Sequence, residues 1–284
     1  MSEATNDRLN PVPSGDFSIH RAHRTTPFTM PLNHYHEAYE IYYMRSGERY
    51  YFIKDRTYRI QPGDLVLIDK HVLHKTQHIT KSHERILLHY RDGFLDPLLG
   101  GAEWSPASIF EHPVVRLTMK QQSYVESLLD RLLEESRLPT PESPIYIKVT
   151  LAELLLYTAR CIREQTHAAV RSEPANPMFE RISAVAAYIN DHYANDLSLT
   201  LLSGLFHINP HYLSRIFNKV TGFSFVEYVT LVRLKEAQKL LLAGDKNVTE
   251  VAETVGFESL SHFGRVFKAS MGMSPKDYRK IYGS

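Results

Sequence analysis

The 284-residue sequence contains one cysteine, Cys161, and one tryptophan. A single cysteine cannot form an internal disulfide, and its apolar neighbours predict a small core hydrophobe, which suits a reducing cytoplasm. No apolar run reaches about 18 residues, the length that indicates a membrane-spanning helix. The polar stretch Met1–Gly15 lacks the apolar core of a secretion signal. We therefore expect a cytoplasmic protein with no membrane partner.

The sequence also lacks an excess of charge of either sign. Its 33 basic residues oppose 32 acidic residues, so the formal net charge is +1 and does not indicate nucleic-acid binding. A hydrophobic content of 43% and a charged content of 23% are ordinary for a folded protein and argue against wholesale disorder. The length predicts about two domains. Any function has to be argued from the positions of residues along the chain.

Short strands dominate the first part of the sequence. Runs of β-branched and aromatic residues are separated by turn residues such as Ser46-Gly47 and Gln61–Asp64. The pattern predicts five strands, over Glu40–Met44, Tyr50–Ile53, Thr57–Ile60, Leu65–Ile68 and Arg85–Tyr90. Many short strands at close spacing indicate a sandwich or a small barrel.

Histidines and a glutamate stand at even positions at the start of this region. His34, His36 and Glu40 can face one side of a strand pair, because side chains alternate along a strand. With His74 they would give three imidazoles and a carboxylate, a suitable ligand set for Fe, Mn, Ni or Zn. The same residues with Tyr42 could instead line a metal-free pocket for a sugar or another small polar ligand. We favour that pocket, with no cofactor; His71, His78, His83 and His89 are expected to be surface or packing residues.

Helical periodicity replaces the strand pattern from Thr118 to Glu164. One apolar stripe consists of Val125, Leu128, Leu129, Leu132 and Leu133. A second helix is predicted to open with Ser143 as N-cap and Pro144 at its first position. Two antiparallel helices of this kind either cover the barrel or pair with the same hairpin of a second chain. The polar stretch 164–176 predicts a linker.

An internal repeat marks the last part of the sequence. Leu213–Phe217 recurs fifty positions later as Phe263–Phe267, and Gly222, Ser224 and Tyr228 recur as Gly272, Ser274 and Tyr278. Each copy predicts a short helix, a turn and a second helix. In the first copy these helices run from about Leu199 to Phe206 and from Pro210 to Thr221. In the second they run from Val248 to Val255 and from Ser259, as cap, to about Met271.

The second helix of each copy has a polar face without acidic residues. Neither 209–225 nor 259–272 contains an aspartate or a glutamate. A basic helix packed behind another helix across a tight turn fits the major groove of DNA. Arginine can read guanine edges, whereas lysine and serine suit phosphates. The expected DNA contacts are His211, Ser214, Arg215, Asn218 and Lys219 in the first copy and Ser261, His262, Arg265 and Lys268 in the second.

The spacer between the copies has a suitable length. Phe225 to about Ala243 is predicted to be one helix. Its 19 residues at a rise of about 1.5 Å span about 28 Å. Successive major-groove entries on one face of B-DNA lie about 34 Å apart. Two recognition helices of one chain could therefore enter adjacent turns.

These features resemble a known family. Val251–Phe257, Phe263–Lys268, Gly272–Pro275 and Tyr278-Arg279 are similar to the signature of the AraC/XylS family of bacterial transcription regulators. The resemblance implies that the outward residues of both recognition helices contact bases, with Lys219 and Lys268 on phosphates. The first copy departs from the family pattern at Ser203 and Gly204, where alanine is commoner.

The strand-rich part resembles the cupin barrel. His34–Glu40 followed by Gly47 is similar to the first cupin signature, and Pro62-Gly63-Asp64 followed by His74 is similar to the second. The Asp69–His71 segment departs from metal-binding cupins, and the resemblance to AraC-type regulators implies an effector in the barrel rather than a metal. The expected fold class is α+β, with a cupin-like barrel domain (1–112), a helical hairpin and linker (113–177) and a tandem helix-turn-helix domain (178–284).

The leading hypothesis is a transcription regulator whose barrel binds a small-molecule effector, with a carbohydrate as the first candidate. Its expected partners are double-stranded DNA, a second copy of the chain and, for an activator, RNA polymerase. The alternative is a metal-dependent cupin enzyme fused to an accessory helical domain. A DNA-repair protein with the same tail would need a cluster of metal-bound cysteines, and Cys161 is the only cysteine. We expect no enzymatic activity.

Overall fold

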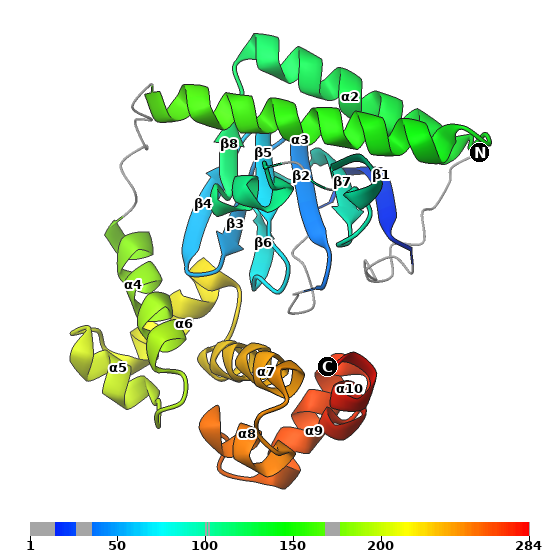
Figure 1. Ribbon diagram of the computed structural model, residues 1–284. Coiled ribbons are helices and arrows are strands. Elements are labelled where there is room, and N and C mark those ends of the chain that lie inside the picture. The colour runs from blue at the N-terminus through cyan, green and yellow to red at the C-terminus, as the bar shows by residue number, and fades with distance from the viewer. Residues whose placement is uncertain (1–14, 27–35, 100, 102, 168–176, 284) are drawn as a thin grey trace. The chain divides into compact units, whose positions relative to one another are not determined.

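The computed structural model describes residues 15–26, 36–99, 101, 103–167 and 177–283. The chain divides into two compact units, one formed by Met1–Lys54 and Tyr58–Pro174 and the other by Asp55–Thr57 and Ala175–Ser284. Two β-sheets and a helical hairpin characterise the first unit, and helices the second (Figure 1). The predicted α+β class is confirmed. None of the helices in the described ranges combines the length and the apolar character needed to cross a bilayer.

Eight strands form two sheets. The order in the five-stranded sheet is β1 (Phe17–Arg24), β7 (His83–Tyr90), β2 (Tyr39–Ser46), β5 (Asp64–Ile68) and β8 (Val114–Arg116). The three-stranded sheet has the order β4 (Arg56–Ile60), β3 (Arg49–Ile53) and β6 (His74–His78). Neighbouring strands of the larger sheet pair antiparallel throughout.

All five predicted strands are present, each slightly longer than or equal to its predicted range. Strands β1, β6 and β8 were not predicted. The β6 sequence His-Lys-Thr-Gln-His has no apolar residue, because its inward side chains line a polar interior. Strand β1 mixes histidine and arginine with its apolar residues, and β8 has only three residues, so neither gives a clear alternating pattern.

The five-stranded sheet is covered on both faces, and alternate residues face different cores. On β2, Tyr39, Ile41 and Tyr43 belong to the cluster shared with the helical hairpin. Tyr42 and Met44 belong to the cluster between the two sheets. This explains why β2 is buried along most of its length. By the same alternation, Glu40 on β2 faces the interior between the sheets.

Helices α2 (Met119–Arg137) and α3 (Ser143–His167) cover the outer face of the larger sheet (Figure 1). The predicted stripe is buried there, apart from Leu133, which is partly buried. The prediction that the hairpin covers the sheet is thus confirmed for this stripe. Helix α3 begins at Ser143 itself rather than after it. The Ser143 hydroxyl accepts from the Thr140 amide and donates to Glu135, so it ties the turn to α2.

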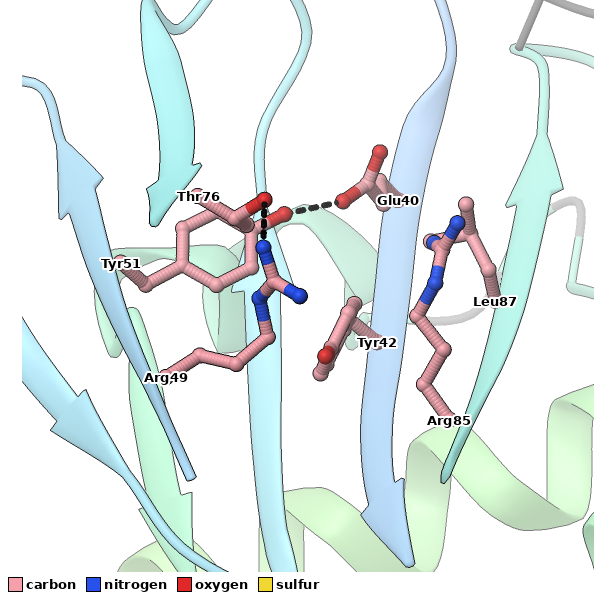
Figure 2. A pocket seen from close by; sticks show the side chains of 7 residues that line it. All are labelled: Glu40, Tyr42, Arg49, Tyr51, Thr76, Arg85 and Leu87. Carbon is pink, nitrogen blue, oxygen red and sulfur yellow. Dashed lines mark hydrogen bonds between the residues drawn. The ribbon is translucent and has the colours of Figure 1, made fainter. Parts of the chain in front are cut away.

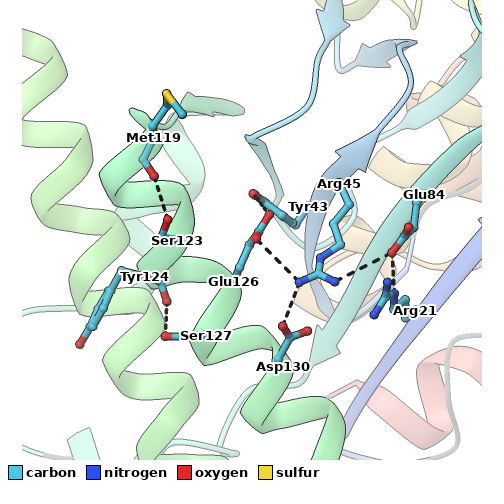
Figure 3. A network of polar contacts seen from close by, with 10 residues as sticks. All are labelled: Arg21, Tyr43, Arg45, Glu84, Met119, Ser123, Tyr124, Glu126, Ser127 and Asp130. Carbon is cyan, nitrogen blue, oxygen red and sulfur yellow. Dashed lines mark hydrogen bonds and ion pairs between the residues drawn. The ribbon is translucent and has the colours of Figure 1, made fainter.

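A polar network joins α2 to the sheet (Figure 3). Arg45, at the end of β2, lies 2.9 Å from Asp130 and 3.8 Å from Glu126 on α2, and 4.0 Å from Glu84 on β7. The Tyr43 hydroxyl donates to Glu126 at 2.7 Å. Hydrogen bonding to this carboxylate and burial raise the pKa of Tyr43, with burial the larger effect. Strand β2 is therefore linked directly to the hairpin.

Short segments complete the first unit. Helix α1 (Asp96–Leu99) and the 3-10 helix η1 (Pro106–Glu111) follow β7, and Phe110 packs into the cluster beneath the hairpin. Gly63, in the turn before β5, has a φ of +89°, and a Cβ there would lie 2.2 Å from the Gln122 side chain on α2. The glycine of the predicted second cupin motif thus suits the left-handed backbone of this turn and leaves room for the Gln122 side chain.

The second unit consists of seven helices in the described residues. They are α4 (Pro177–His192), α5 (Leu199–Leu205), α6 (Pro210–Thr221), α7 (Phe225–Ala243), α8 (Val248–Thr254), α9 (Leu260–Met271) and α10 (Pro275–Tyr282). The repeat and the spacer helix are confirmed to within a residue at each end. The predicted caps are also confirmed. The side-chain Oδ1 of Asn209 accepts from two amides of α6, and the Ser259 hydroxyl accepts from the His262 amide. Gly222 and Gly272 end α6 and α9 in the left-handed conformation.

Each helix-turn-helix contains one residue of positive φ in its turn. His207 has a φ of 51° in the first copy, and Gly256 has a φ of 88° in the second. A Cβ on Gly256 would lie 2.6 Å from the Ala194 carbonyl oxygen, so only glycine fits there without a backbone shift. In the first copy the turn residue is a histidine, whose left-handed backbone has a moderate conformational cost.

Candidate functional site

Helix α6 presents a polar, acid-free surface. Its apolar residues Leu213, Ile216, Phe217 and Val220 are buried. All five predicted DNA contacts of this helix are exposed, namely His211, Ser214, Arg215, Asn218 and Lys219. The Arg215 guanidinium lies 5.5 Å from the centroid of the exposed Tyr212 ring. This geometry leaves the five polar side chains available to a partner.

Helix α9 repeats the arrangement. Phe263 and Phe267 are buried, and Val266 is partly buried against the same cluster. The four predicted contacts Ser261, His262, Arg265 and Lys268 are exposed. The acids of this copy, Glu250, Glu253 and Glu258, stand on α8 and in the turn, where Glu250 accepts from the Asn247 amide in a capping box. The negative charges are thus placed off the recognition helix.

Helix α7 separates the two motifs within the second unit. It packs against α6, α8 and α10, while α4 packs against α6 and α7. Its Tyr228 is buried and donates to Asn190 of α4 at 3.1 Å, which ties α4 to the spacer helix. Gln238 near the other end donates to the Tyr278 hydroxyl of α10 at 3.2 Å. Helix α6 packs against α7 directly, and Gln238 also donates to Met271 Sδ at the end of α9 at 3.1 Å, so α7 contacts both recognition helices.

A second polar site lies between the sheets, around Glu40. His36 Nε2 lies 3.1 Å and His89 Nε2 3.0 Å from Glu40 Oε2, and the Tyr51 hydroxyl donates to Oε1 at 2.6 Å. His74 Nε2 is 3.7 Å from the same Oε2. Although burial opposes ionisation, the charge of His74 and hydrogen bonds from His36 and His89 hold the pKa of Glu40 well below its usual range. Glu40 is thus a buried carboxylate.

The histidine orientations fit a cation. His36 Nδ1 lies 2.7 Å from the Ala38 carbonyl oxygen, and His74 Nδ1 lies 2.8 Å from that of Val72. A carbonyl only accepts, so each Nδ1 donates, and each Nε2 is turned towards Glu40. Either an imidazolium proton or a bound cation can then lie between nitrogen and carboxylate. Histidines that donate through Nδ1 to a carbonyl, as His36 does, are typical of metal sites, and His36, His89 and Glu40 offer ligand atoms within 4.8 Å of one another, a set that suits a divalent metal.

The structure brings together most of the predicted pocket residues. His36, Glu40, Tyr42 and His74 are all buried in the first unit. His34 lies outside the described residues. His89 was expected to be a surface or packing residue rather than part of the pocket, yet it stands directly opposite Glu40 where β7 pairs with β2. Arg85 and His89 are four residues apart, so their side chains lie on the same face of the predicted strand. Only the strand pairing identifies Glu40 as the neighbour of His89.

Two arginines enter the same interior (Figure 2). A pocket between the sheets is lined by Glu40, Tyr42, Arg49, Tyr51, Thr76, Arg85 and Leu87. Arg49 donates to the Thr76 hydroxyl at 3.1 Å and to His83 Nε2 at 2.9 Å. Burial and the nearby positive charges of Arg49, Arg85 and Arg24 lower the pKa of His83 to about 3, so this imidazole is neutral. Neither arginine was among the pocket residues predicted from the sequence.

The remaining histidines and the cysteine have other roles. His78 is exposed and His71 is partly buried with a φ of 58°, as expected for surface positions, whereas His83 is buried beside Arg49.

Cys161 is buried within the hairpin cluster, as predicted. Burial raises the pKa of its thiol to about 11. The thiol is therefore protonated at neutral pH and is a poor nucleophile.

A polar interior between two sheets and, in the same chain, two helix-turn-helix motifs are typical of a ligand-binding transcription regulator. Comparison with known proteins agrees. The AraC-like ligand binding domain matches residues 14–155, half of the chain, and a helix-turn-helix domain matches residues 202–281. The chain therefore belongs to the AraC family of helix-turn-helix transcription regulators.

Individual relatives cover nearly the whole chain. The uncharacterized HTH-type transcriptional regulator YfiF of Bacillus subtilis is 28% identical over 94% of this chain and 84% of its own length. The HTH-type transcriptional activator RhaS of Escherichia coli is 23% identical over 94% of each chain. The crystal structure of ToxT from Vibrio cholerae O395 covers 94% of this chain and 98% of its own, with 14% identity and a TM-score of 0.38.

Proposed function

We propose that this regulator reads DNA sequence with α6 and α9 and responds to a small molecule held between its two sheets. The observation that carries the DNA-binding part is the exposure of all nine predicted contacts on two helices without an acidic residue. Such a surface favours a polyanion, and its arginines supply the bidentate donors that base edges require.

The contacts divide into two roles. Arg215 and Arg265, at matching positions of the two copies, read base edges, supported by His211, Ser214, Asn218, Ser261 and His262. Lys219 and Lys268, in the last turns of α6 and α9, contact phosphates. Because α7 spans about 28 Å, the two helices enter successive major-groove turns.

The effector site is the polar interior around Tyr42, Arg49 and Arg85. A ligand shifts a protein between two states only if it binds them with different affinity. Strand β2 carries both Tyr42 of the pocket and Arg45, whose ion pairs with Asp130 and Glu126 hold α2. Movement of β2 on ligand binding would therefore change the contacts of the hairpin.

We propose that α3 pairs two chains. The face of α3 turned away from the sheet leaves Ile145 67% exposed, Val149 47% and Leu156 42%, at spacings of four and seven residues. An exposed apolar row at helical spacing favours association with a like helix. Val149→Glu should therefore give monomers in sedimentation experiments, whereas the same change at the exposed Lys120 should not. A chain that is monomeric before the substitution would contradict this assignment.

The DNA-binding role implies that the protein works beside the chromosome, in the cytoplasm. An activator would also contact RNA polymerase. The direct test of DNA binding is selection of binding sites from a random DNA pool with the purified full-length protein. We expect an enriched motif in two parts one helical turn apart. Recovery of no common sequence would contradict sequence-specific binding.

One observation favours a second function. His36, His89 and Glu40 could hold Fe, Mn, Ni or Zn, as in a metal-dependent cupin enzyme, and His74 Nε2 lies 3.7 Å from the same carboxylate. A bound metal would supply Lewis-acid or redox chemistry, and Tyr51 would orient Glu40 through its hydrogen bond. Elemental analysis of protein purified without chelator decides between the two. Stoichiometric metal that is lost in His89→Ala would support the second function, and its absence in both proteins would support the metal-free pocket.

A further inference from the structure

Tyr212 is an exposed aromatic residue beside the predicted DNA contacts of α6. It stands three residues before Arg215, whose guanidinium carbon lies over its ring, 5.5 Å from the ring centroid. Tyr212 is 37% exposed, so its ring faces solvent in part. Residues three apart are neighbours on a helix surface, and a guanidinium within about 6 Å of a tyrosine ring is attracted to the face of that ring. Tyr212 was not among the contacts predicted from the sequence.

The direction of helical side chains explains this contact. Long side chains on a helix point back towards its N-terminus, so Arg215 reaches over the preceding turn, where Tyr212 stands. A recognition helix contacts base edges with its N-terminal residues. The ring therefore holds the guanidinium near the end of α6 that base reading requires.

The ring is the group that restricts Arg215 within the described part of the chain. No hydrogen bond or ion pair joins the Arg215 guanidinium to a described residue, and 209–225 contains no acidic residue that would attract it. An unrestricted arginine side chain loses rotamer freedom when it binds a partner, and this loss weakens binding. An arginine that a neighbouring ring already restricts loses less freedom on binding.

The second motif differs at the matching positions. Fifty residues later, His262 stands at the position of Tyr212, and Arg265 at that of Arg215. The His262 ring packs edge-on against the buried Phe257 ring, with the centroids 5.7 Å apart. Among the described residues, the exposed Arg265 side chain has no ring contact, hydrogen bond or ion pair. The first motif thus presents a restricted arginine and the second an unrestricted one.

We propose that Tyr212 is a positioning residue for base reading by the first motif, because its ring holds the Arg215 guanidinium in the orientation that reads a base edge. The inference rests on the proposed DNA-reading function and adds a residue that acts through Arg215. Arginine reads guanine through two parallel donors, so the orientation of its planar group decides how well it discriminates between bases. The ring therefore contributes to specificity rather than to general attraction for DNA.

The test compares discrimination between base pairs by full-length proteins. A DNA site selected by the parent protein is varied one base pair at a time, and fluorescence anisotropy gives the dissociation constant for each site. Arg215→Ala identifies the base pair that Arg215 reads, because discrimination is lost there. We expect Tyr212→Leu to lower discrimination at this same base pair by about twofold to fivefold, the effect of an exposed cation–π contact. Discrimination at the base pair that Arg265→Ala identifies should be unchanged.

Further variants separate the ring from the hydroxyl and from folding. Tyr212→Phe keeps the ring and should keep the discrimination of the parent protein. Tyr212→Gln suits an exposed helical position and covers the case in which leucine impairs folding. In the Arg215→Ala background, Tyr212→Leu should have no further effect at this base pair, because both changes remove the same interaction. The matched control is Tyr282→Leu, since Tyr282 is an exposed tyrosine of α10 in the same unit, and it should discriminate like the parent.

Three results would overturn the proposal. They are equal discrimination by the parent and the variants without the ring, an equal loss in Tyr212→Phe and Tyr212→Leu, and a further loss when Tyr212→Leu is added to Arg215→Ala. If Arg215→Ala loses discrimination and Tyr212→Leu does not, the positioning role is wrong and base reading by Arg215 stands. If Arg215→Ala also keeps its discrimination, base reading by Arg215 fails and the positioning role fails with it.

Discussion

Glu40 on β2 and His89 on β7 stand directly opposite each other in the antiparallel sheet, with His89 Nε2 3.0 Å from Glu40 Oε2. The pair joins the two central strands at the point where the interior is most polar. His36 and Tyr51 complete the hydrogen bonding of the carboxylate. Three side chains, those of His36, Tyr51 and His89, thus surround the buried carboxylate of Glu40.

Because Glu40 and His89 are buried and hydrogen-bonded to each other, they should not contribute independently to the free energy of unfolding. Glu40→Gln and His89→Leu should each lower the free energy of unfolding by about 1.5–3 kcal/mol, the usual loss for a hydrogen bond to a charged group. The double variant should lose less than the sum, because both changes remove the same interaction. Denaturant unfolding of the four proteins with EDTA present measures the coupling. Additive losses would show that the two residues act separately.

Asp64 predicts a pH dependence of stability. Burial raises the pKa of Asp64 to about 6, although the Gln61 amide and Arg116 oppose the shift. The folded state therefore holds the proton of Asp64 more tightly than the unfolded state does, because the pKa of an unperturbed aspartate is 3.8. The contribution of Asp64 to stability is therefore most favourable at low pH and is lost as the pH rises through this interval.

Asp64→Asn removes this penalty and keeps an oxygen that accepts from Gln61. We expect the variant to exceed the parent in unfolding free energy by about 1–2 kcal/mol at pH 7, with the gap closing near pH 4. Urea titrations at several pH values provide the measurement. The exposed Asp96→Asn should show no such trend, and a constant gap for Asp64→Asn would mean that its charge is not the cause.

Base reading and phosphate binding should separate experimentally on α9. Arg265→Ala should cost about 1–3 kcal/mol on a selected site and little on random DNA. Lys268→Ala should weaken binding to both by a similar amount and reduce the salt dependence. Fluorescence anisotropy at several salt concentrations resolves the two patterns. Lys239→Ala, on the exposed side of α7 and paired with Glu236, is the control and should match the parent.

The turns of the two motifs should respond differently to substitution. Gly256→Ala should destabilise the second unit by roughly 2–4 kcal/mol, because its backbone is left-handed and a Cβ would press on the Ala194 carbonyl. Gly244→Ala is the matched control, with a φ of 82° and no atom within 4 Å of the added carbon. It should cost less, about 1 kcal/mol. Equal melting temperatures for the two variants would refute the close contact.

The helical part could be predicted closely from the sequence because its signals are local. Caps such as Asn209 and Ser259, stops such as Gly222 and Gly272, and apolar periodicity fix each helix within a few residues of chain. The repeat then identified the outward side chains, since burial of Leu213 and Phe263 leaves the opposite face to solvent.

The barrel site was predicted only in part because its contacts are non-local. Glu40, His36 and Tyr42 share one strand region, and simple alternation placed them together. His89 and Arg85 come from β7, and Arg49 from β3, so their positions depend on strand pairing and on how the sheets face each other. The polar strand β6 shows the same limit, because inward polar residues remove the apolar pattern that indicates a strand.

The central claim, that one chain reads two successive turns of DNA, is tested most directly by footprinting the protein on a selected site. Arg215→Ala should lose protection in one part of the site, and Arg265→Ala in another part about one helical turn away. Loss of the same bases in both variants, or protection of a single turn by the parent protein, would contradict the account.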